Sequence, residues 1–270
     1  MHFLNHKPMN KLSLIVTFLF ISIMLSGCKK DGEVQDPRSS LKKIKTITTG
    51  ETTSTGDVIQ NTKVFEYNSD GKLSRVIETV FSAGTISHID TTTHYYSRDS
   101  VKSIRISSGY VNGQLISNTT IQKIVLNSNG YISSCVTSQT GQPDWVETYQ
   151  YDKSGYCIKV IQLSGSTQFV QDLKYSGGNM VSLIYNTGSQ VINEELTYYL
   201  DKINTISPIN NWLGNFGKGS MNLVKTDKLI IQGSPGFTFS FEYEFDVNNY
   251  VTKRTTIQNN SSYWDKYTYQ

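Results

Sequence analysis

Charge is scarce in this chain, and the scarcity limits what it binds. Asp, Glu, Lys and Arg make up 17% of its 270 residues. The 25 basic residues exceed the 22 acidic ones by three, which is too small an excess for nucleic-acid recognition. We therefore expect no nucleic acid among its partners. With 17 Tyr and 11 Phe but only five Pro the chain can bury a core, and the abundant Ser, Thr, Asn and Gln suit the wet face of a sheet.

Motifs of catalysis and metal binding are also missing. The sequence has no Gly-x-Ser-x-Gly, P-loop, Cys-x-x-Cys or His-Glu-x-x-His motif. His88, Asp90 and His94 share one predicted strand, but strand neighbours two apart lie ~6.5 to 7 Å from each other. We interpret them as a solvated strand face rather than a metal site. Glu194 and Glu195 point to opposite faces of a strand, so they form no acid/base pair. We expect no enzymatic activity, no catalytic residue and no cofactor.

Cysteine is sparse as well. Besides Cys28 there are only Cys135 and Cys157. Both fall at apolar positions of predicted strands that have one strand between them, which separates them by ~9.5 Å. A disulfide reaches about 7 Å between Cα atoms. The sequence therefore predicts two buried free thiols.

The longest apolar run lies near the N-terminus, from Leu12 to Leu25 after Lys7 and Lys11. It is short for a permanent transmembrane helix and is typical of a signal peptide, which we place at residues 1–27. The sequence Leu25-Ser26-Gly27-Cys28 resembles the lipobox of bacterial lipoproteins. The resemblance implies a lipid on Cys28 and attachment to a membrane, whereas the alternative is an ordinary thiol after an ordinary signal.

Residues 28–40 are polar and charged, contain Pro37 and lack an apolar period, so we expect a flexible tether. Residue 29 is Lys rather than the Asp that commonly retains lipoproteins at the inner membrane, so outer-membrane delivery is expected. Lys29-Lys30-Asp31-Gly32-Glu33 resembles the tag of surface-exported lipoproteins of Bacteroidota, although Gly32 interrupts its acidic pair. This favours the cell surface over the periplasmic face.

One hairpin pattern repeats along residues 41–270, which we predict to be a single domain. In the clearest copy, Phe65 and Tyr67 alternate with polar residues, a turn ends at Gly71, and Leu73 and Val76 follow. The same pattern recurs at Tyr151–Gly155, and looser copies occur at Tyr96–Ser100, Leu126–Gly130, Tyr175–Asn179 and Phe245–Asn249. The turn markers, where positive φ is expected, are Gly71, Gly130, Gly155, Asn179 and Asn249. Apolar residues two and five positions after a marker cannot share one face of a regular strand, which predicts a bulge.

These hairpins and the turns between them predict an all-β, antiparallel up-and-down meander of about 14 to 16 strands. Open twisted sheets seldom exceed ~10 strands, so the meander should curl into a barrel or a wrapped sheet. Phe239, Phe241 and Tyr243 would then face a dry interior. The inverse arrangement is a membrane-spanning barrel with its apolar face outward, for which a lipid anchor would be superfluous.

One segment interrupts the strands. Ser207 and Pro208 form a helix start, and apolar residues follow with helical spacing up to Phe216. The pattern predicts a short amphipathic helix near residues 208–216 that plugs the barrel mouth or covers an edge. The other interpretation is a lid that holds Trp212 over a ligand.

The lipobox, the tether, the Tyr-x-x-x-Gly hairpins and the late helical interruption together resemble uncharacterised Bacteroidota lipoproteins. These are described as a domain of unknown function with a porin-like fold, and the likeness covers Leu41 to Gln270. Single hairpins also resemble the tyrosine-aspartate (YD) repeats of bacterial wall-associated and Rhs proteins, strictly only at Tyr151-Asp152 to Gly155. The family resemblance implies a barrel-like shell and supplies no functional residue.

We therefore expect a lipid-anchored cell-envelope protein that acts as a non-catalytic ligand-binding module for a glycan or an apolar ligand. Trp145, Trp212 and Trp264 are the candidate ligand-binding residues. A first alternative is a structural scaffold of an outer-membrane complex with an envelope protein as its partner. A second is a hydrolase, which would need converging polar groups that the sequence does not display.

Overall fold

The computed structural model describes residues 41–53, 56–111, 114–188, 190–207, 215–234, 236–259 and 261–270. In these residues the chain forms strands and turns and no helix. The predicted signal peptide, the tether and Cys28 lie outside the described residues. Most of the predicted helix, residues 208–214, also lies outside them. The described ranges contain no candidate for a membrane-spanning helix.

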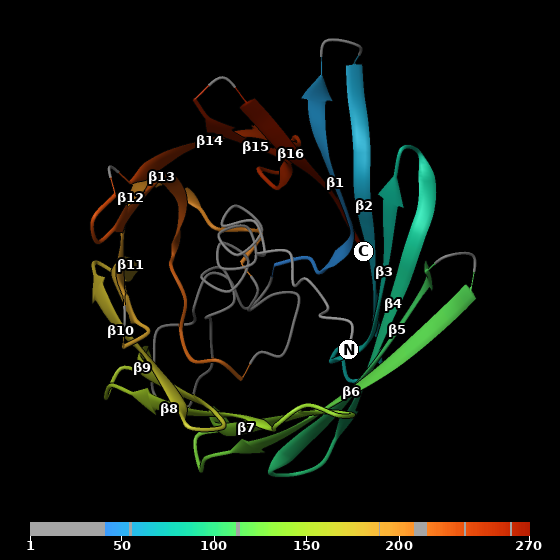
Figure 1. The fold of residues 1–270 in the computed structure, drawn as a ribbon. Helices are drawn as coiled ribbons and strands as arrows, with labels where there is room; N and C mark the ends of the chain where they lie inside the picture. Colours follow the sequence, from blue (N-terminus) through green and yellow to red (C-terminus); the bar gives the residue numbers. More distant parts are fainter. Residues whose placement is uncertain are drawn as a thin grey trace.

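Sixteen antiparallel strands close into one barrel (Figure 1). In chain order they are β1 (Ile44–Thr53), β2 (Gly56–Tyr67), β3 (Leu73–Ser82), β4 (Thr85–Tyr96), β5 (Ser100–Val111), β6 (Gln114–Leu126), β7 (Ile132–Gln139), β8 (Trp145–Tyr151), β9 (Cys157–Ser164), β10 (Thr167–Ser176), β11 (Asn179–Asn186), β12 (Val191–Ile203), β13 (Asn222–Ile231), β14 (Phe237–Phe245), β15 (Val251–Gln258) and β16 (Ser261–Tyr269). Each strand pairs with the next, and β16 pairs with β1, where Thr268 lies opposite Thr46. The predicted meander is confirmed, and closure removes both sheet edges.

The barrel has two ends, which we name by their connections. The basal end carries the turns that follow the even-numbered strands, from β2 to β14, together with the described chain ends at Leu41 and Gln270. The distal end carries the turns that follow the odd-numbered strands. The hairpin pattern recognised in the sequence belongs to the basal turns.

A polar side chain organises four basal turns. Asn68, Asn127, Asp152 and Asp246 each accept a hydrogen bond from the main-chain N–H four residues later, at 2.8 to 3.0 Å. Asx side chains stabilise tight turns in this way because they mimic a backbone acceptor. A residue with positive φ follows within each turn, and it is glycine in three of them and Asn249 in the fourth. Sequence alone therefore specifies these turns.

The hairpin between β10 and β11 departs from the prediction. Asn179 was expected at positive φ, but the positive values belong to Gly177 and Gly178, at 56° and 79°. Asn179 instead begins β11 and is buried. The prediction was wrong because the two preceding glycines already supply the left-handed conformations that the turn needs.

The predicted bulges are confirmed. In the hairpin of β2 and β3, Glu66 pairs with Arg75 whereas Tyr67 pairs with Leu73, so Ser74 is an extra residue. The extra residue lets both Leu73 and Val76 be buried. Register shifts at the same place in the repeat occur at Val125/Leu126, Gln150/Tyr151, Lys174/Tyr175 and Glu244/Phe245.

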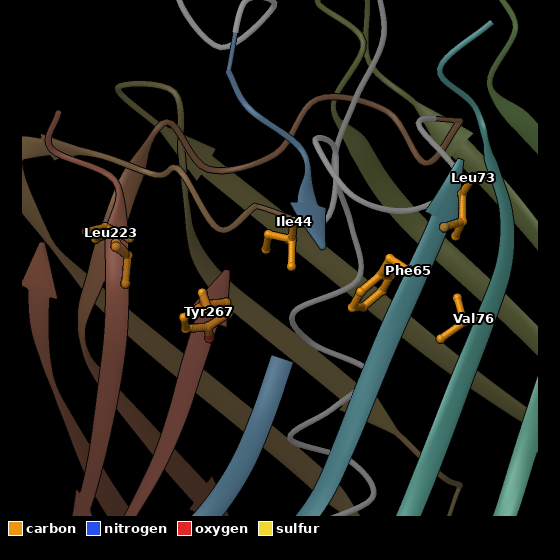
Figure 2. Packing of buried hydrophobic residues seen from close by; sticks show 7 residues of the cluster. Ile44, Phe65, Leu73, Val76, Leu223 and Tyr267 are labelled. Atoms are coloured by element: carbon orange, nitrogen blue, oxygen red, sulfur yellow. The ribbon is translucent and has the colours of Figure 1, made fainter. Parts of the chain in front are cut away.

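The apolar core lies inside the barrel near its basal end. Its largest cluster comprises Ile44, Phe65, Leu73, Val76, Leu223, Val251 and Tyr267 (Figure 2). Leu223 on β13 and Val76 on β3 belong to strands that are not neighbours in the sheet, so the cluster forms across the concave side. Phe239 and Phe241 are buried too, and Tyr243 packs against this cluster. The prediction of an inward apolar face is confirmed.

Two smaller clusters continue the core around the wall. One contains Cys135 and the other Cys157, both buried and free, as predicted. Burial raises the pKa of the Cys135 thiol to about 11 and that of Cys157 to about 12. Both thiols therefore stay protonated at neutral pH and act as small apolar side chains.

The connection between β12 and β13 ties the basal turns together. We call its described residues, 204–207 and 215–221, the basal strap. Asn215 accepts a hydrogen bond from the N–H of Ile132 at 2.7 Å, and the N–H of Lys218 donates to the carbonyl of Gly155 at 2.7 Å. At the other side, the hydroxyl of Thr205 accepts from the N–H of Val251 at 3.1 Å. The strap thus joins turns that are far apart in the sequence.

The outer face is polar by comparison. Ion pairs join neighbouring strands there, as between Arg75 and Glu66 at 2.7 Å or Lys253 and Glu244 at 2.9 Å. Glu195 is exposed and pairs with Lys228, whereas Glu194 is buried, which confirms that these two carboxylates point to opposite faces.

Candidate functional site

Beyond the core, toward the distal end, the inward positions become polar. The change occurs along single strands, because residues two apart share a face. On β8, for example, the inward series runs from Tyr151 and Tyr149 in the core clusters to Glu147 and Trp145. Other charged or amide side chains on this inner belt are Lys63, Glu78, Asp90, Arg105, Gln162, Gln171, Glu194, Asp227, Arg254 and Asp265.

Three aromatic rings stack on the inner wall beside this belt. Trp145 on β8 and Phe169 on β10 have ring centroids 5.5 Å apart and planes 18° apart. Phe169 and Tyr185 on β11 follow at 5.9 Å and 7°. Ser164 lies opposite Trp145 on the intervening β9, and its small side chain leaves room for the rings to meet. We call these three residues the aromatic stack.

A row of hydrogen-bonded polar side chains runs along the same strands. The amide of Gln162 donates to one carboxylate oxygen of Glu147 at 2.7 Å, and the hydroxyl of Tyr149 donates to the other at 2.8 Å. The amide of Gln171 donates to the carbonyl oxygen of Gln162 at 3.4 Å. We call Glu147, Gln162 and Gln171 the amide row. Every donor in it points toward Glu147, which holds that carboxylate in place.

The charge of Glu147 acts on the surrounding phenols. Burial, reinforced by this carboxylate, raises the pKa of Tyr149 well above its usual value. The same two causes raise the pKa of Tyr185 to about 12. Both phenols therefore remain neutral and can donate hydrogen bonds. Among the described residues, no basic side chain forms an ion pair with Glu147.

The histidine cluster also faces inward. His88, Asp90 and His94 share a face of β4, as predicted, but Asp90 is buried and accepts hydrogen bonds from Arg105 and Ser107. The interpretation as a solvated face was therefore wrong for Asp90, because this face lies inside the closed barrel. In the described part of the chain, no three His, Cys, Asp or Glu side chains are grouped to hold a metal ion.

The ionisation of this cluster follows from its contacts. Burial by itself raises the pKa of Asp90, but the hydrogen bonds from Arg105 and Ser107 outweigh it and bring the pKa below its usual value. Burial lowers the pKa of His94 to about 4, and its Nδ1 lies 2.8 Å from the hydroxyl of Ser103. His94 is thus a neutral part of the wall.

The three candidate tryptophans lie in different environments. Trp145 belongs to the aromatic stack on the inner wall. Trp264 lies against Gly50 with the ammonium of Lys266 4.2 Å from its ring centroid, and it is 3% exposed, so it presents no ring face to a ligand. Trp212 lies outside the described residues.

Sequence reasoning missed the partners of Trp145. Phe169 and Tyr185 lie on β10 and β11, and Gln162 and Gln171 supply most of the amide row. The alternation of Phe169, Gln171 and Leu173 along one strand was the available signal. It indicates a shared face without indicating which strands lie beside it.

A family model described as a domain of unknown function (DUF4595) with porin-like fold matches residues 65–253. A crystal structure of a porin-like protein from Bacteroides uniformis superposes with a TM-score of 0.61 at 16% identity, and the match covers 84% of this chain and 98% of that one. A porin-like protein from Bacteroides vulgatus matches with a TM-score of 0.32 at 9% identity, covering 84% and 99% of the two chains. No curated protein matched the sequence.

Proposed function

The chain belongs to the family described as a domain of unknown function with porin-like fold, and from this premise we propose that it is a ligand-binding protein of the cell envelope. In this proposal Cys28 carries a lipid that holds the protein at the outer membrane, on the cell surface. The barrel binds its ligand on the distal inner wall and performs no catalysis. The geometry favours a glycan over a purely apolar ligand.

The observation that supports this proposal is the aromatic stack beside the amide row. Sugar rings present C–H groups on their faces and hydroxyl groups around their edges. The flat face of an aromatic ring packs against the C–H groups, and amide and carboxylate groups form hydrogen bonds with the hydroxyl groups. Trp145, at one end of the stack, supplies a ring face, and the carboxylate of Glu147, held in place by the buried Gln162, supplies a polar group. Ligand sites commonly combine an apolar lining with a few fixed polar groups in this way.

The carboxylate content of the site supports binding rather than hydrolysis. Glycosidases that use enzyme carboxylates need two, about 5 to 9.5 Å apart, with one protonated. The aromatic stack and the amide row contain one, Glu147, and its two oxygens accept hydrogen bonds from Gln162 and Tyr149. Asp172 on the same wall faces outward, where it pairs with Lys159 at 3.2 Å.

Isothermal titration of the full lipidated chain in detergent micelles tests the proposal. The titrants are the hexaoses of cellulose, starch, xylan and chitin. We expect one of them to bind, and Trp145→Ala to weaken binding at least tenfold, about 1.4 kcal/mol. Trp264→Phe is the control, because Trp264 lies under Lys266 and should leave the affinity unchanged. No binding by any hexaose, or equal affinity of Trp145→Ala and the wild type, would contradict the proposal.

A second candidate function, an interaction scaffold, has its own supporting observation. The distal ends of β2, β4 and β6 carry exposed apolar side chains at Ile59, Ile86 and Leu115. A patch of this kind suits contact with another envelope protein. A photo-crosslinking residue placed at Leu115 in cells should then capture one defined protein, and a smear of unrelated adducts would argue against it.

A further inference from the structure

The basal end of the barrel combines lysine, aromatic and exposed apolar side chains in a way that the distal end does not. We propose that this end docks against the bilayer, with its lysines at anionic lipid headgroups. The inference rests on the lipid anchoring proposed above and deepens it, because it determines which way the barrel faces.

Six lysines around the basal end lie over aromatic rings. The ammonium groups are 4.9 to 5.9 Å from the ring centroids. The pairs are Lys42 with Tyr250, Lys43 with Tyr67, Lys72 with Tyr96, Lys202 with Phe245, Lys218 with Tyr156 and Lys225 with Tyr199. The side chains of tyrosine and lysine each combine an apolar part with a polar end. Both side chains therefore favour the membrane interface, where the lipid headgroups lie.

Charge in the connecting segments is concentrated at the same end. The basal connections, with residues 41–43, contain the basic residues Lys42, Lys43, Lys72, Arg98, Lys153 and Lys218 and the acidic residues Asp70, Asp99, Asp152 and Asp246. Two of these acids, Asp152 and Asp246, accept hydrogen bonds from the main chain of their own turns. The distal connections contain one charged residue, Asp144. Six basic against four acidic residues give the basal connections a net charge of +2, and Asp144 gives the distal connections −1, so an anionic surface complements the basal end better.

Two apolar side chains project from the basal end without cover. Val247, in the turn between β14 and β15, is 98% exposed, and Leu200, near the end of β12, is 81% exposed. They are the most exposed of the large apolar side chains in the described part of the chain. Insertion of such side chains among headgroups removes their apolar surface from water.

The course of the chain brings this end toward the anchor. The described chain enters at the basal end, where the N–H of Lys42 donates to the hydroxyl of Tyr250 at 3.2 Å. Residues 28–40, between the predicted lipid and this point, reach at most about 45 Å when fully extended. The distal end lies a full strand length further away. Docking of the basal end therefore turns the aromatic stack away from the bilayer, toward arriving ligands.

Site-specific quenching tests the orientation. The full lipidated chain is reconstituted into vesicles of phosphatidylethanolamine and phosphatidylglycerol, with a maleimide fluorophore on Val247→Cys. Cys135 and Cys157 are buried with raised pKa, so the introduced thiol is labelled selectively. The matched control is Ile86→Cys, at an exposed distal position. We expect doxyl lipids to quench the label at 247 at least threefold more than the label at 86.

Equal quenching at the two positions, or stronger quenching at 86, would overturn the proposal. A double variant tests the role of charge. Lys42→Glu combined with Lys202→Glu should lower the quenching of the label at 247 toward that of the label at 86. Vesicles of phosphatidylcholine alone should have the same effect. Quenching that is unchanged by both would show that anionic headgroups are not the partner.

These results stand apart from the glycan test. Trp145→Ala should leave quenching at 247 unchanged, because Trp145 lies on the inner wall. If no hexaose binds but the label at 247 is quenched, the docking stands and the binding proposal fails. If mass spectrometry finds no lipid on Cys28, the proposed anchoring fails, and the same quenching, measured on chain added to preformed vesicles, decides the docking.

Discussion

The basal and distal halves of the barrel share the same strands and differ in what those strands turn inward. In the basal half, Phe65 and Leu73 belong to a cluster with residues of strands that are not their neighbours in the sheet, such as Leu223, and the basal strap joins the turns. In the distal half, Trp145 and Glu147 line the wall within a layer of aromatic and polar side chains. One half therefore supplies stability, whereas the other offers groups that a ligand can use.

The difference begins in the turns. Five basal hairpins contain a bulge that doubles the apolar residues available to the core, as Leu73 and Val76 show. Register shifts also occur toward the distal end, at Thr49/Gly50 and Val80/Phe81, but the inward side chains there include charged pairs such as Lys63 and Glu78, at 3.2 Å. The two halves can be compared directly by mutation because single strands run through both.

The largest contrast is expected between two phenylalanines. Phe65 is 2% exposed in the basal core, so Phe65→Ala should lower the free energy of unfolding by about 4 kcal/mol. Phe169→Ala, in the half-buried aromatic stack, should cost about 1 to 2 kcal/mol. Guanidinium denaturation measures both. Equal losses would mean that the distal half is packed as tightly as the basal half.

The next contrast is between inner and outer ion pairs. Arg254 donates to Asp265 at 2.6 Å, and their side chains are 17% and 10% exposed. Asp265→Asn leaves the guanidinium without its anion inside the barrel and should cost about 3 kcal/mol. Glu66→Gln, which breaks the exposed pair with Arg75, should cost under about 0.5 kcal/mol. Urea denaturation measures both losses. A larger loss for Glu66→Gln than for Asp265→Asn would contradict the assignment of Asp265 to the inner face and Glu66 to the outer face.

The strap allows a comparison of two glycines with positive φ. At Gly217 a Cβ would lie 2.5 Å from Cε1 of Tyr151 and 2.8 Å from the carbonyl oxygen of Gly155, whereas at Gly84 it would meet nothing within 4 Å. Gly84→Ala should therefore show the conformational cost alone, about 1 kcal/mol, and Gly217→Ala about 2 to 3 kcal/mol. Thermal unfolding measures the loss of stability in both variants. Identical shifts in Tm would mean that the packing of the strap does not contribute to basal stability.

The last predicted effect is a gain in stability. Burial raises the pKa of Asp227 from 3.8 to about 6, and its Oδ1 has no hydrogen-bond partner among the described residues. The folded state therefore binds this proton more tightly, so the contribution to stability is full below pH 3.8 and is lost as the pH rises through about 6. Asp227→Asn should be about 2 to 3 kcal/mol more stable than the wild type at pH 8, and equal to it below about pH 3.8.

The measurement for Asp227 is the difference in unfolding free energy between variant and wild type across this pH range. The difference is needed because His94, with its pKa lowered to about 4, contributes with the opposite sign. Its stabilisation is lost as the pH falls from about 6.5 toward 4. A constant offset between variant and wild type would refute the raised pKa.

The sequence contained most of the fold and little of the site. The spacing of Leu73 and Val76 predicted the bulge, and alternation in β14 predicted that Phe239 and Phe241 face inward. The site depends on which strands lie side by side. Gln162 and Gln171 meet across β9 and β10. Alternation along β8 places Trp145 on the same face as Tyr149, but it does not show that Phe169, two strands away, lies beside it.

Hydrogen exchange of the full chain, with and without the tightest-binding hexaose, tests the central claim most directly. The account predicts added protection in the distal segments of β8 to β11, around Trp145 and residues 167–171, and none in the basal core around Phe65. Protection confined to the outer strands or to the basal end, with the segment around Trp145 unchanged, would contradict it.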